Sequence, residues 1–137
     1  MAQSPQITID WDELLKAAGP YPIEAFHFVR EGLNHTVIRA HEDAMSVSEI
    51  ERHVNGRELC LGLAEFAIDQ YGMMAPAVLH HWQIHRTDDF GRIVFAMIDF
   101  GVMSKTPEDS LEDFRAVYDF REVFSRDELV GRIGRGG

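Results

Sequence analysis

The clearest helix signal in the chain is the stretch Thr87-Asp88-Asp89-Phe90-Gly91-Arg92-Ile93-Val94-Phe95-Ala96-Met97-Ile98-Asp99-Phe100-Gly101. Thr87 is a favoured N-cap residue, and the two aspartates after it lie where the positive end of a helix dipole stabilises carboxylates. The apolar residues recur at the i, i+3, i+4, i+7, i+8 spacing of one buried helix face. Gly101 suits the end of such a helix. The stretch therefore predicts an amphipathic helix over about 88–100.

Comparable start and stop signals lie on both sides of this stretch. Asp10 with Glu13, and Asn55 with Glu58, have the spacing of a capping box. Glycines after the apolar runs mark helix ends, and prolines at 22 and 76 suit a first turn. Together these signals predict helices over 11–18, 22–40, 55–71, 76 to about 84 and from Ser125 onward, with a short helical segment after Ser46.

The segment 102–120 leaves two alternatives open. Residues 102–105 and 116–120 can pair as a small β-hairpin, or Thr106 and Pro107 open a further helix with its apolar residues inward. With the hairpin, two helices joined by a short turn would resemble a winged helix, with 88–100 in the place of the recognition helix. A plain helical bundle explains the same pattern equally well.

We therefore expect a mainly α protein, a single-domain helical bundle over 1–137, whose C-terminal half is winged-helix-like if the β-hairpin forms. The ends, 1–8 and 131–137, are expected to be flexible. At 137 residues, with 45% hydrophobic and 26% charged residues, the chain has the composition of one ordinary globular domain. It shows no basic leader and no long apolar run, which predicts a cytoplasmic protein without membrane contact.

The net charge of −10, from 13 basic and 23 acidic residues, argues against generic attraction to nucleic acid or to anionic membranes. Residues 88–128 hold 11 acidic and 5 basic residues, so the acidity is concentrated over the predicted recognition helix. A DNA-binding winged helix needs basic and amide side chains there. Nucleic acid is therefore not expected as a partner.

Several blocks of the sequence resemble, in the same order, those of a known family. They are YPIEAFHFVREGL (21–33), HVNGRELC (53–60), TDDFGRIVF (87–95), SKT (104–106), EDF (112–114) and VYDF (117–120). The family is small, uncharacterised and restricted to planctomycete and verrucomicrobial bacteria, so the resemblance implies no catalytic residue, cofactor or partner. This chain has Gln83 after Trp82 where the family pattern tends to have glycine, which disfavours a tight left-handed turn there.

Two groups of side chains have spacings that metal sites use. Glu24-x-x-His27, with Glu31 one turn further on, has the i, i+3 spacing of di-iron bundles, but the chain shows no second copy. His81-x-x-x-His85 can place two imidazoles on one helix face, although a helix end is predicted between them. We interpret both groups as polar surface and expect no metal or other cofactor; whether either group binds anything stays open.

The remaining motifs of catalysis are missing from the sequence. Cys60 is the single cysteine and lies among leucines on a predicted helix, which predicts a buried, inert thiol and excludes an internal disulfide. The chain has no Gly-x-Ser-x-Gly elbow, no phosphate-binding loop and no dinucleotide-binding glycine motif. No catalytic residue is predicted, and a non-enzymatic protein is favoured.

The outward positions of the 88–100 helix predict a protein-binding surface made of Asp88, Arg92, Phe95 and Asp99. Phe95 would be an aromatic anchor inside a polar rim, unless it packs beneath another helix. The predicted function is a non-enzymatic protein–protein interaction or regulatory module with an unidentified protein partner. Alternatives from other classes are a winged-helix DNA-binding transcriptional regulator, and a small metal-binding protein or enzyme that uses histidine and glutamate.

Overall fold

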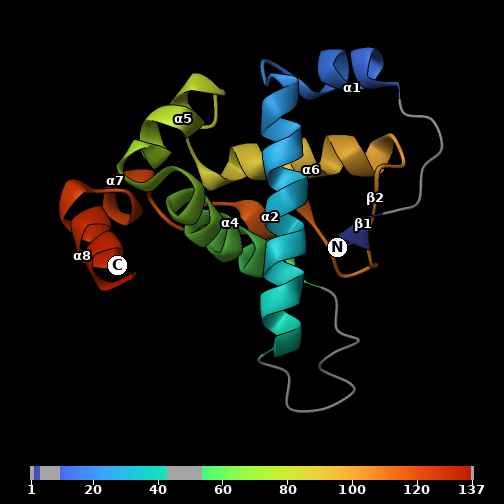
Figure 1. Ribbon diagram of the computed structural model, residues 1–137. Helices are drawn as coiled ribbons and strands as arrows, with labels where there is room; N and C mark the ends of the chain where they lie inside the picture. The colour runs from blue at the N-terminus through green and yellow to red at the C-terminus, as the bar shows by residue number, and fades with distance from the viewer. Residues whose placement is uncertain (1, 4–9, 43–53, 137) are drawn as a thin grey trace.

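The computed structural model describes residues 2–3, 10–42 and 54–136, and the prediction of a mainly α protein is confirmed (Figure 1). The predicted short helix after Ser46 lies outside the described residues. None of the described helices is both long and apolar enough to cross a membrane. In chain order the elements are β1 (Ala2–Gln3), α1 (Trp11–Ala18), α2 (Ile23–Glu42), α4 (Gly56–Tyr71), the 3-10 helix η1 (Gly72–Met74), α5 (Ala75–His81), α6 (Thr87–Asp99), β2 (Met103–Ser104), the 3-10 helix η2 (Leu111–Phe114), α7 (Phe120–Val123) and α8 (Arg126–Gly136).

Several helices begin and end at the capping residues that the sequence predicted. α1 begins after Asp10, whose carboxylate accepts a hydrogen bond from the Glu13 backbone N–H at 3.1 Å. α4 begins after Asn55, which forms a reciprocal capping box with Glu58. Gly72 ends α4 in the left-handed region, at φ 53°. The two ends for which flexibility was predicted, 1–8 and 131–137, contain β1 and the last part of α8.

The start of α6 differs from the prediction by one residue. Arg86 is its N-cap, and the Asp89 carboxylate accepts from the Arg86 backbone N–H at 3.2 Å. The Thr87 hydroxyl, expected to cap the helix, instead donates to the Phe114 carbonyl at 2.7 Å. The prediction of Thr87 as N-cap is therefore wrong, because a contact with a segment 27 residues away takes its hydroxyl.

The core lies where α2 crosses α4 and α6 (Figure 1). Gly32 of α2 faces Leu63, and Gly62 of α4 faces Thr36; in both places an added Cβ would overlap the neighbouring side chain. These glycines let the two backbones approach closely. The largest fully buried side chains come from most of the helices and from the segment before α6: Leu14, Phe26, Leu33, Leu59, Leu63, Leu79, Ile84, Phe90, Ile93, Met97 and Phe114.

Phe114 of η2 is wedged between α4 and α6. Its side chain is fully buried. A Cβ added at Gly56 of α4 or at Gly91 of α6 would lie 2.8 Å from an atom of Phe114. The two glycines thus form a socket for one aromatic ring, and this socket fixes the course of the segment that follows α6.

The structure of the segment 102–120 differs from both alternatives that the sequence left open, the β-hairpin and the further α-helix. β2 pairs antiparallel with β1 near the N-terminus, and the described residues between β2 and α7 contain η2 but no second strand and no α-helix. Side-chain caps keep the turns short: the Asp109 carboxylate accepts from the Thr106 N–H at 2.8 Å, and Ser110 caps η2. The β-hairpin predicted as the wing of a winged helix is therefore not formed by this segment.

The turn between α5 and α6 forms despite the unfavourable residue in it. Gln83 lies in the left-handed region at φ 65°, and its N–H donates to the His80 carbonyl at 3.0 Å. The next N–H, that of Ile84, donates to the Leu79 carbonyl at 2.9 Å, and Ile84 is buried. Burial of Ile84 and these hydrogen bonds offset a backbone cost of about 1–2 kcal/mol for a non-glycine residue. The sequence predicted that Gln83 would disfavour a left-handed turn, but the turn forms with Gln83 in it.

Candidate functional site

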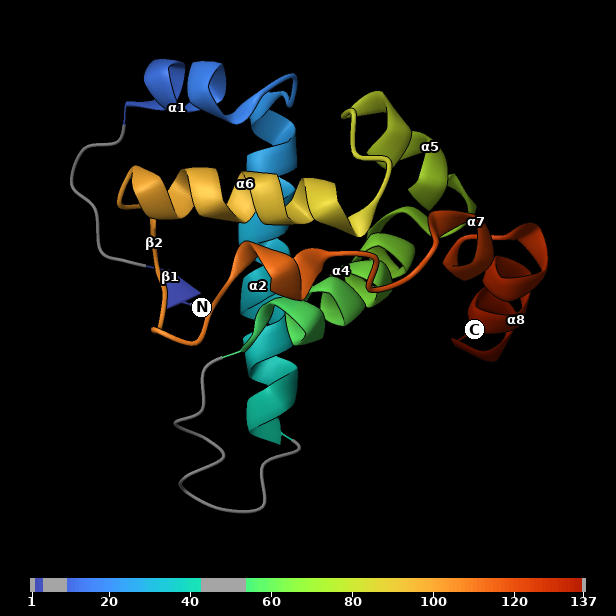
Figure 2. The same cartoon turned by 180° about the vertical axis from the view of Figure 1, so that it is seen from behind.

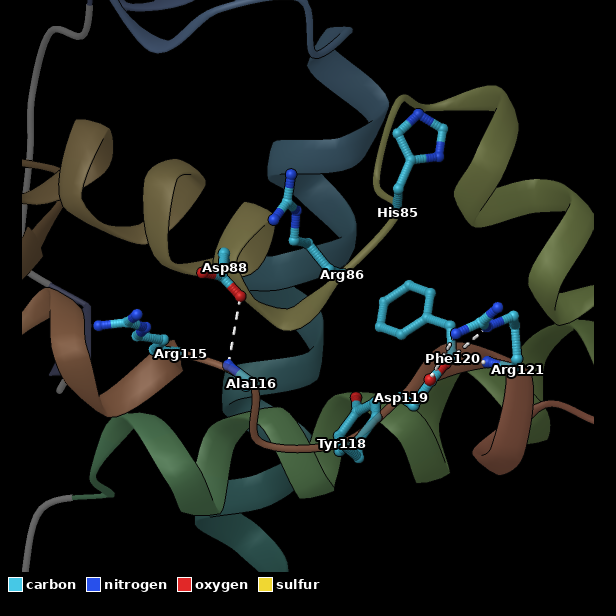
Figure 3. Close-up of a pocket in the computed structure, with 9 residues that line it drawn as sticks. All are labelled: His85, Arg86, Asp88, Arg115, Ala116, Tyr118, Asp119, Phe120 and Arg121. Carbon is cyan, nitrogen blue, oxygen red and sulfur yellow. Dashed lines mark hydrogen bonds and ion pairs between the residues drawn. The ribbon is translucent and has the colours of Figure 1, made fainter.

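A cleft opens between the start of α6 and the segment that joins η2 to α7 (Figure 3). We call it the arginine cleft. Its volume is about 640 Å³, within the usual range for ligand-binding sites. Its lining residues come from two segments about 30 positions apart in the chain: His85, Arg86, Asp88, Arg115, Ala116, Tyr118, Asp119, Phe120 and Arg121.

One wall of the cleft is fixed by the first turn of α6. The Thr87 hydroxyl, fully buried, donates to the Phe114 carbonyl at 2.7 Å and accepts from the Val117 N–H at 3.0 Å. The Asp88 carboxylate accepts from the Ala116 N–H at 3.2 Å, as Figure 3 shows. Ala116 is in the left-handed region at φ 46°, which only surrounding contacts can maintain. The wall from 114 to 117 is therefore attached to α6 by three hydrogen bonds.

The opposite wall is fixed by the buried carboxylate of Asp89. It accepts from the backbone N–H groups of His85 and Arg86 at 2.8 and 3.2 Å, and from the Tyr21 hydroxyl at 2.5 Å. Burial, and then this hydrogen bond to Asp89, raise the pKa of Tyr21 to about 12. Arg92 completes the group with an ion pair to Asp89 at 3.6 Å. The Asp89 carboxylate therefore holds the backbone that carries two side chains of the cleft, those of His85 and Arg86.

Three arginines project around the cleft, and each is exposed. Arg121 pairs with Asp119 at 3.2 Å, and hydrogen bonds from Arg121 lower the pKa of that carboxyl. Arg115 pairs with Glu112 at 3.7 Å, and both side chains are more than 70% exposed. Among the described residues Arg86 has no acidic partner within ion-pair distance. The cleft thus offers one unpaired guanidinium and two that are held only by solvent-exposed ion pairs.

Stacked aromatic rings form the floor beside the arginines. The rings of Tyr118 and Phe120 are nearly parallel, at 25° with centroids 5.8 Å apart. The Tyr118 hydroxyl donates to the Cys60 carbonyl at 2.7 Å, and Phe120 packs edge-on against Phe124 at 5.2 Å. Both stacked rings remain half-buried, so they present an apolar surface that the core holds in place.

A smaller hollow of about 240 Å³ continues the cleft toward α5. It shares His85, Phe120 and Arg121 with the arginine cleft and adds the side of α5 at His80. The rings of His80 and His85 contact each other, with centroids 4.7 Å apart. The two hollows therefore adjoin each other at His85, Phe120 and Arg121, and we call the pair of them the groove.

The surface predicted from the sequence lies along one side of α6 beside this groove. Asp88 lines the cleft, and Arg92 and Asp99 are exposed. Phe95 is half-buried: Phe114 packs edge-on against it at 6.2 Å, and the Lys105 ammonium lies 5.6 Å from its ring centre. Sequence reasoning missed the three cleft arginines and the two stacked rings, because no spacing in the sequence links the two segments that carry them.

The predicted metal candidates are not assembled into a site by the described residues, which contain no cluster of three metal-ligating side chains. Glu24, His27 and Glu31 are exposed on α2. The ring of His85 contacts His80 rather than His81. The predicted burial of Cys60 is confirmed: the residue is fully buried, and burial raises the pKa of its thiol to about 12.

Comparison of the chain with protein-family models, with curated proteins and with solved structures gave no match. The inference of function therefore rests on the chemistry of the groove.

Proposed function

We propose that this protein is a non-enzymatic binding module that takes an acidic segment of a protein partner into the arginine cleft. One observation carries the proposal: a chain of net charge −10 gathers Arg86, Arg115 and Arg121 around one cleft. Two segments distant in sequence supply these arginines, and hydrogen bonds to the buried Thr87 and Asp89 side chains hold both segments in place. This is a preorganised surface for carboxylates.

Carboxylates suit these three side chains chemically. A guanidinium pairs with a carboxylate through two parallel N–H···O bonds, which gives direction as well as attraction. Among the residues that the structure describes, no carboxylate forms an ion pair with Arg86. Arg115 and Arg121 exchange an exposed intramolecular ion pair for a partner's carboxylate, and such pairs contribute only about 0–1 kcal/mol. The cost of opening the site is therefore small.

The acids in the groove do not cancel this attraction. Asp88 accepts a hydrogen bond from the Ala116 backbone and lies at the start of α6, where the helix dipole stabilises its charge. Asp119 is paired with Arg121. Beside them, the stacked rings of Tyr118 and Phe120 fit an apolar or aromatic side chain next to the partner's acid. The groove thus favours a segment that alternates acidic and apolar residues.

The open shape favours a segment of a protein over a small molecule. Small-ligand sites bury most of the ligand surface. This groove consists of two adjoining hollows that share a wall and stay open to solvent, so an extended chain can lie along both. The surface first predicted on α6 adjoins the groove at Asp88, and we propose that Arg92 and Asp99 belong to its rim.

The other two function classes have less support. In a winged-helix regulator α6 would be the recognition helix, yet α1, α2 and η2 pack against it and the hairpin wing is not formed. A metal-dependent function would need a ligand cluster that the described residues do not provide.

Fluorescence anisotropy with two labelled peptides tests the proposal. One peptide alternates aspartate or glutamate with phenylalanine, and the second replaces each acid by its amide. We expect only the acidic peptide to bind, and Arg86→Glu to weaken its affinity about tenfold, because the variant turns one attraction into repulsion. Lys16→Glu is the matched control, since Lys16 is 76% exposed on α1 and outside the groove.

Three outcomes would refute the proposal. They are equal affinity for the acidic and amide peptides, an equal loss with Lys16→Glu and Arg86→Glu, and no binding of the acidic peptide at millimolar concentration.

A further inference from the structure

The groove contains a second group of basic side chains, the pair His80 and His85. His80 lies in the last turn of α5, and His85 lies in the connection from α5 to α6. Figures 1 and 2 both show α5 beside α7, which carries Arg121. The two imidazole rings contact each other with their centroids 4.7 Å apart, and both residues are exposed. The left-handed turn at Gln83 thus brings the two histidines together.

Backbone hydrogen bonds fix the positions from which the two imidazoles project. The His85 N–H donates to the buried Asp89 carboxylate at 2.8 Å. The Ile84 N–H donates to the Leu79 carbonyl at 2.9 Å, and both of these side chains are buried. The backbone that carries the pair therefore cannot open without breaking buried contacts.

The smaller hollow contains basic and apolar side chains but, among the described residues that line it, no acid. Its basic members are His80, His85 and Arg121, and its apolar members are Pro76, Ile84, Phe120 and Phe124. Arginine is always charged, whereas histidine gains its charge between pH 8 and pH 5. A group that enters this hollow therefore meets one permanent and two pH-dependent positive charges beside an apolar surface.

The charged groups that surround the pair come from the starts of α6 and α7. They are Arg86, Asp88, Asp119 and Arg121. The two acids among them are already bonded: Asp88 accepts from the Ala116 N–H, and Asp119 pairs with Arg121. Two imidazolium charges beside the arginines repel one another, because like charges disfavour each other's ionised form. A carboxylate from a partner offsets this repulsion, so protonation of the pair and binding of an acid favour each other.

We propose that His80 and His85 form a second acid-binding site of the groove, which in its protonated form takes a further carboxylate of the segment held by the arginine cleft. The inference rests on the proposed function. Arg121 and His85 belong to both hollows and lie toward the same end of the cleft in Figure 3, so acids of one extended segment reach both sites. Affinity for the segment should therefore rise as the pH falls through the range in which histidine gains its charge.

Fluorescence anisotropy with the acidic and amide peptides, at pH 8 and pH 6 and at equal ionic strength, tests the proposal. We expect the affinity of the wild type for the acidic peptide to rise about fivefold from pH 8 to pH 6, the effect of about one exposed ion pair. The peptide's carboxylates stay ionised over this range, so the change reports on the protein. The amide peptide should gain no affinity.

Histidine variants assign the rise to the pair. The double variant His80→Gln with His85→Gln should bind as the wild type does at pH 8 and lose the rise at pH 6, because glutamine is polar but does not titrate. His81→Gln is the matched control and should keep the full rise, since His81 is exposed on α5 but lines neither of the two hollows. Circular dichroism at both pH values verifies that each variant is folded.

Isothermal titration calorimetry adds a readout that a purely structural role would not move. At pH 6.5 the acidic peptide is titrated in two buffers that differ in ionisation enthalpy. Wild type and His81→Gln should take up protons on binding, and the double variant should take up none.

Four outcomes would overturn the proposal: a rise that the double variant keeps, one that His81→Gln loses, one that the amide peptide shares, or a loss of affinity by the double variant at pH 8. Acid-selective binding with no dependence on pH also overturns it and leaves the arginine cleft standing. Binding at pH 6 that Arg86→Glu does not weaken supports the histidine site and refutes the role of Arg86. No binding at either pH refutes both proposals.

Discussion

Replacing Thr87 by valine, which exchanges one buried hydroxyl for a methyl group, should destabilise the protein. Thr87 is fully buried, donates to the Phe114 carbonyl and accepts from the Val117 N–H. Valine has nearly the same shape but makes neither bond. The change therefore isolates the hydroxyl from the packing of the side chain.

The magnitude follows from the two groups that lose their partner. A hydrogen bond contributes about 0.5–1.5 kcal/mol net, whereas a buried group left without a partner costs about 1–3 kcal/mol. The Phe114 carbonyl is buried with its side chain, and the Val117 N–H is partly buried. We expect a loss of about 2–4 kcal/mol in the free energy of unfolding. For a domain of this size that lowers the Tm by about 4 °C per kcal/mol.

Urea unfolding followed by circular dichroism measures this loss, and Thr87→Ser is the matched control. Serine keeps the hydroxyl and removes one buried methyl, which costs about 1 kcal/mol. Hydrogen exchange adds a local readout, because the Val117 amide should exchange faster in Thr87→Val and not in Thr87→Ser. If valine costs no more than serine, or the Val117 amide stays protected, the reasoning about this hydroxyl is refuted.

Three further predictions concern the core and its titratable groups. Gly91→Ala should cost about 1–3 kcal/mol of stability in urea unfolding, because its Cβ would lie 2.8 Å from Phe114; an unchanged midpoint would contradict the socket. Cys60, with a pKa of about 12, should not react with Ellman's reagent at mild alkaline pH until the protein unfolds, and rapid native labelling would disprove its burial. The pKa of Tyr21 is raised from 10.0 to about 12, so its stabilising contribution is present below pH 10 and lost as the pH rises from 10 to 12; urea midpoints of Tyr21→Phe should fall less over that interval than those of the wild type.

The helices could be predicted from the sequence because their signals are local. Asp10 with Glu13, and Asn55 with Glu58, satisfy backbone donors within one turn, so no other part of the chain is needed to place them. α6 was found by its apolar periodicity, yet its N-cap was misplaced by one residue. A local rule assigned the Thr87 hydroxyl to its own helix, whereas the folded chain gives it to a carbonyl 27 residues away.

The segment 102–120 failed both predictions for the same reason. Its course depends on one buried ring, Phe114, and on the socket that Gly56 and Gly91 provide from two other helices. Neither glycine reveals this role in the sequence, where each has the appearance of a residue near a helix start. The partner of β2 was equally hidden, since it is β1 at the other end of the chain.

The candidate site was missed because average charge conceals local charge. Residues 88–128 carry 11 acids and 5 bases, and this average predicts an acidic surface around α6. Yet two of those five bases, Arg115 and Arg121, lie in the cleft, and Arg86 stands just before the interval. A net negative charge of this size argues against long-range attraction of anions to the protein as a whole. It does not exclude a site whose charges act over a few ångströms, below the screening length of about 8 Å at physiological salt.

Stability and the proposed recognition depend on different side chains of the same stretch of backbone. Thr87 and Asp89 are buried and fix the two cleft walls by hydrogen bonds to main-chain groups. Arg86, which lies directly beside Thr87, is bonded to Asp89 through its backbone, whereas its side chain is exposed. Because the walls are held by buried groups, the backbone positions that carry the arginines do not depend on the charge of the rest of the surface. Under the proposed function, charge reversal at Arg86 should therefore change affinity while leaving the fold, whereas loss of the Thr87 hydroxyl should loosen the cleft wall formed by residues 114–117.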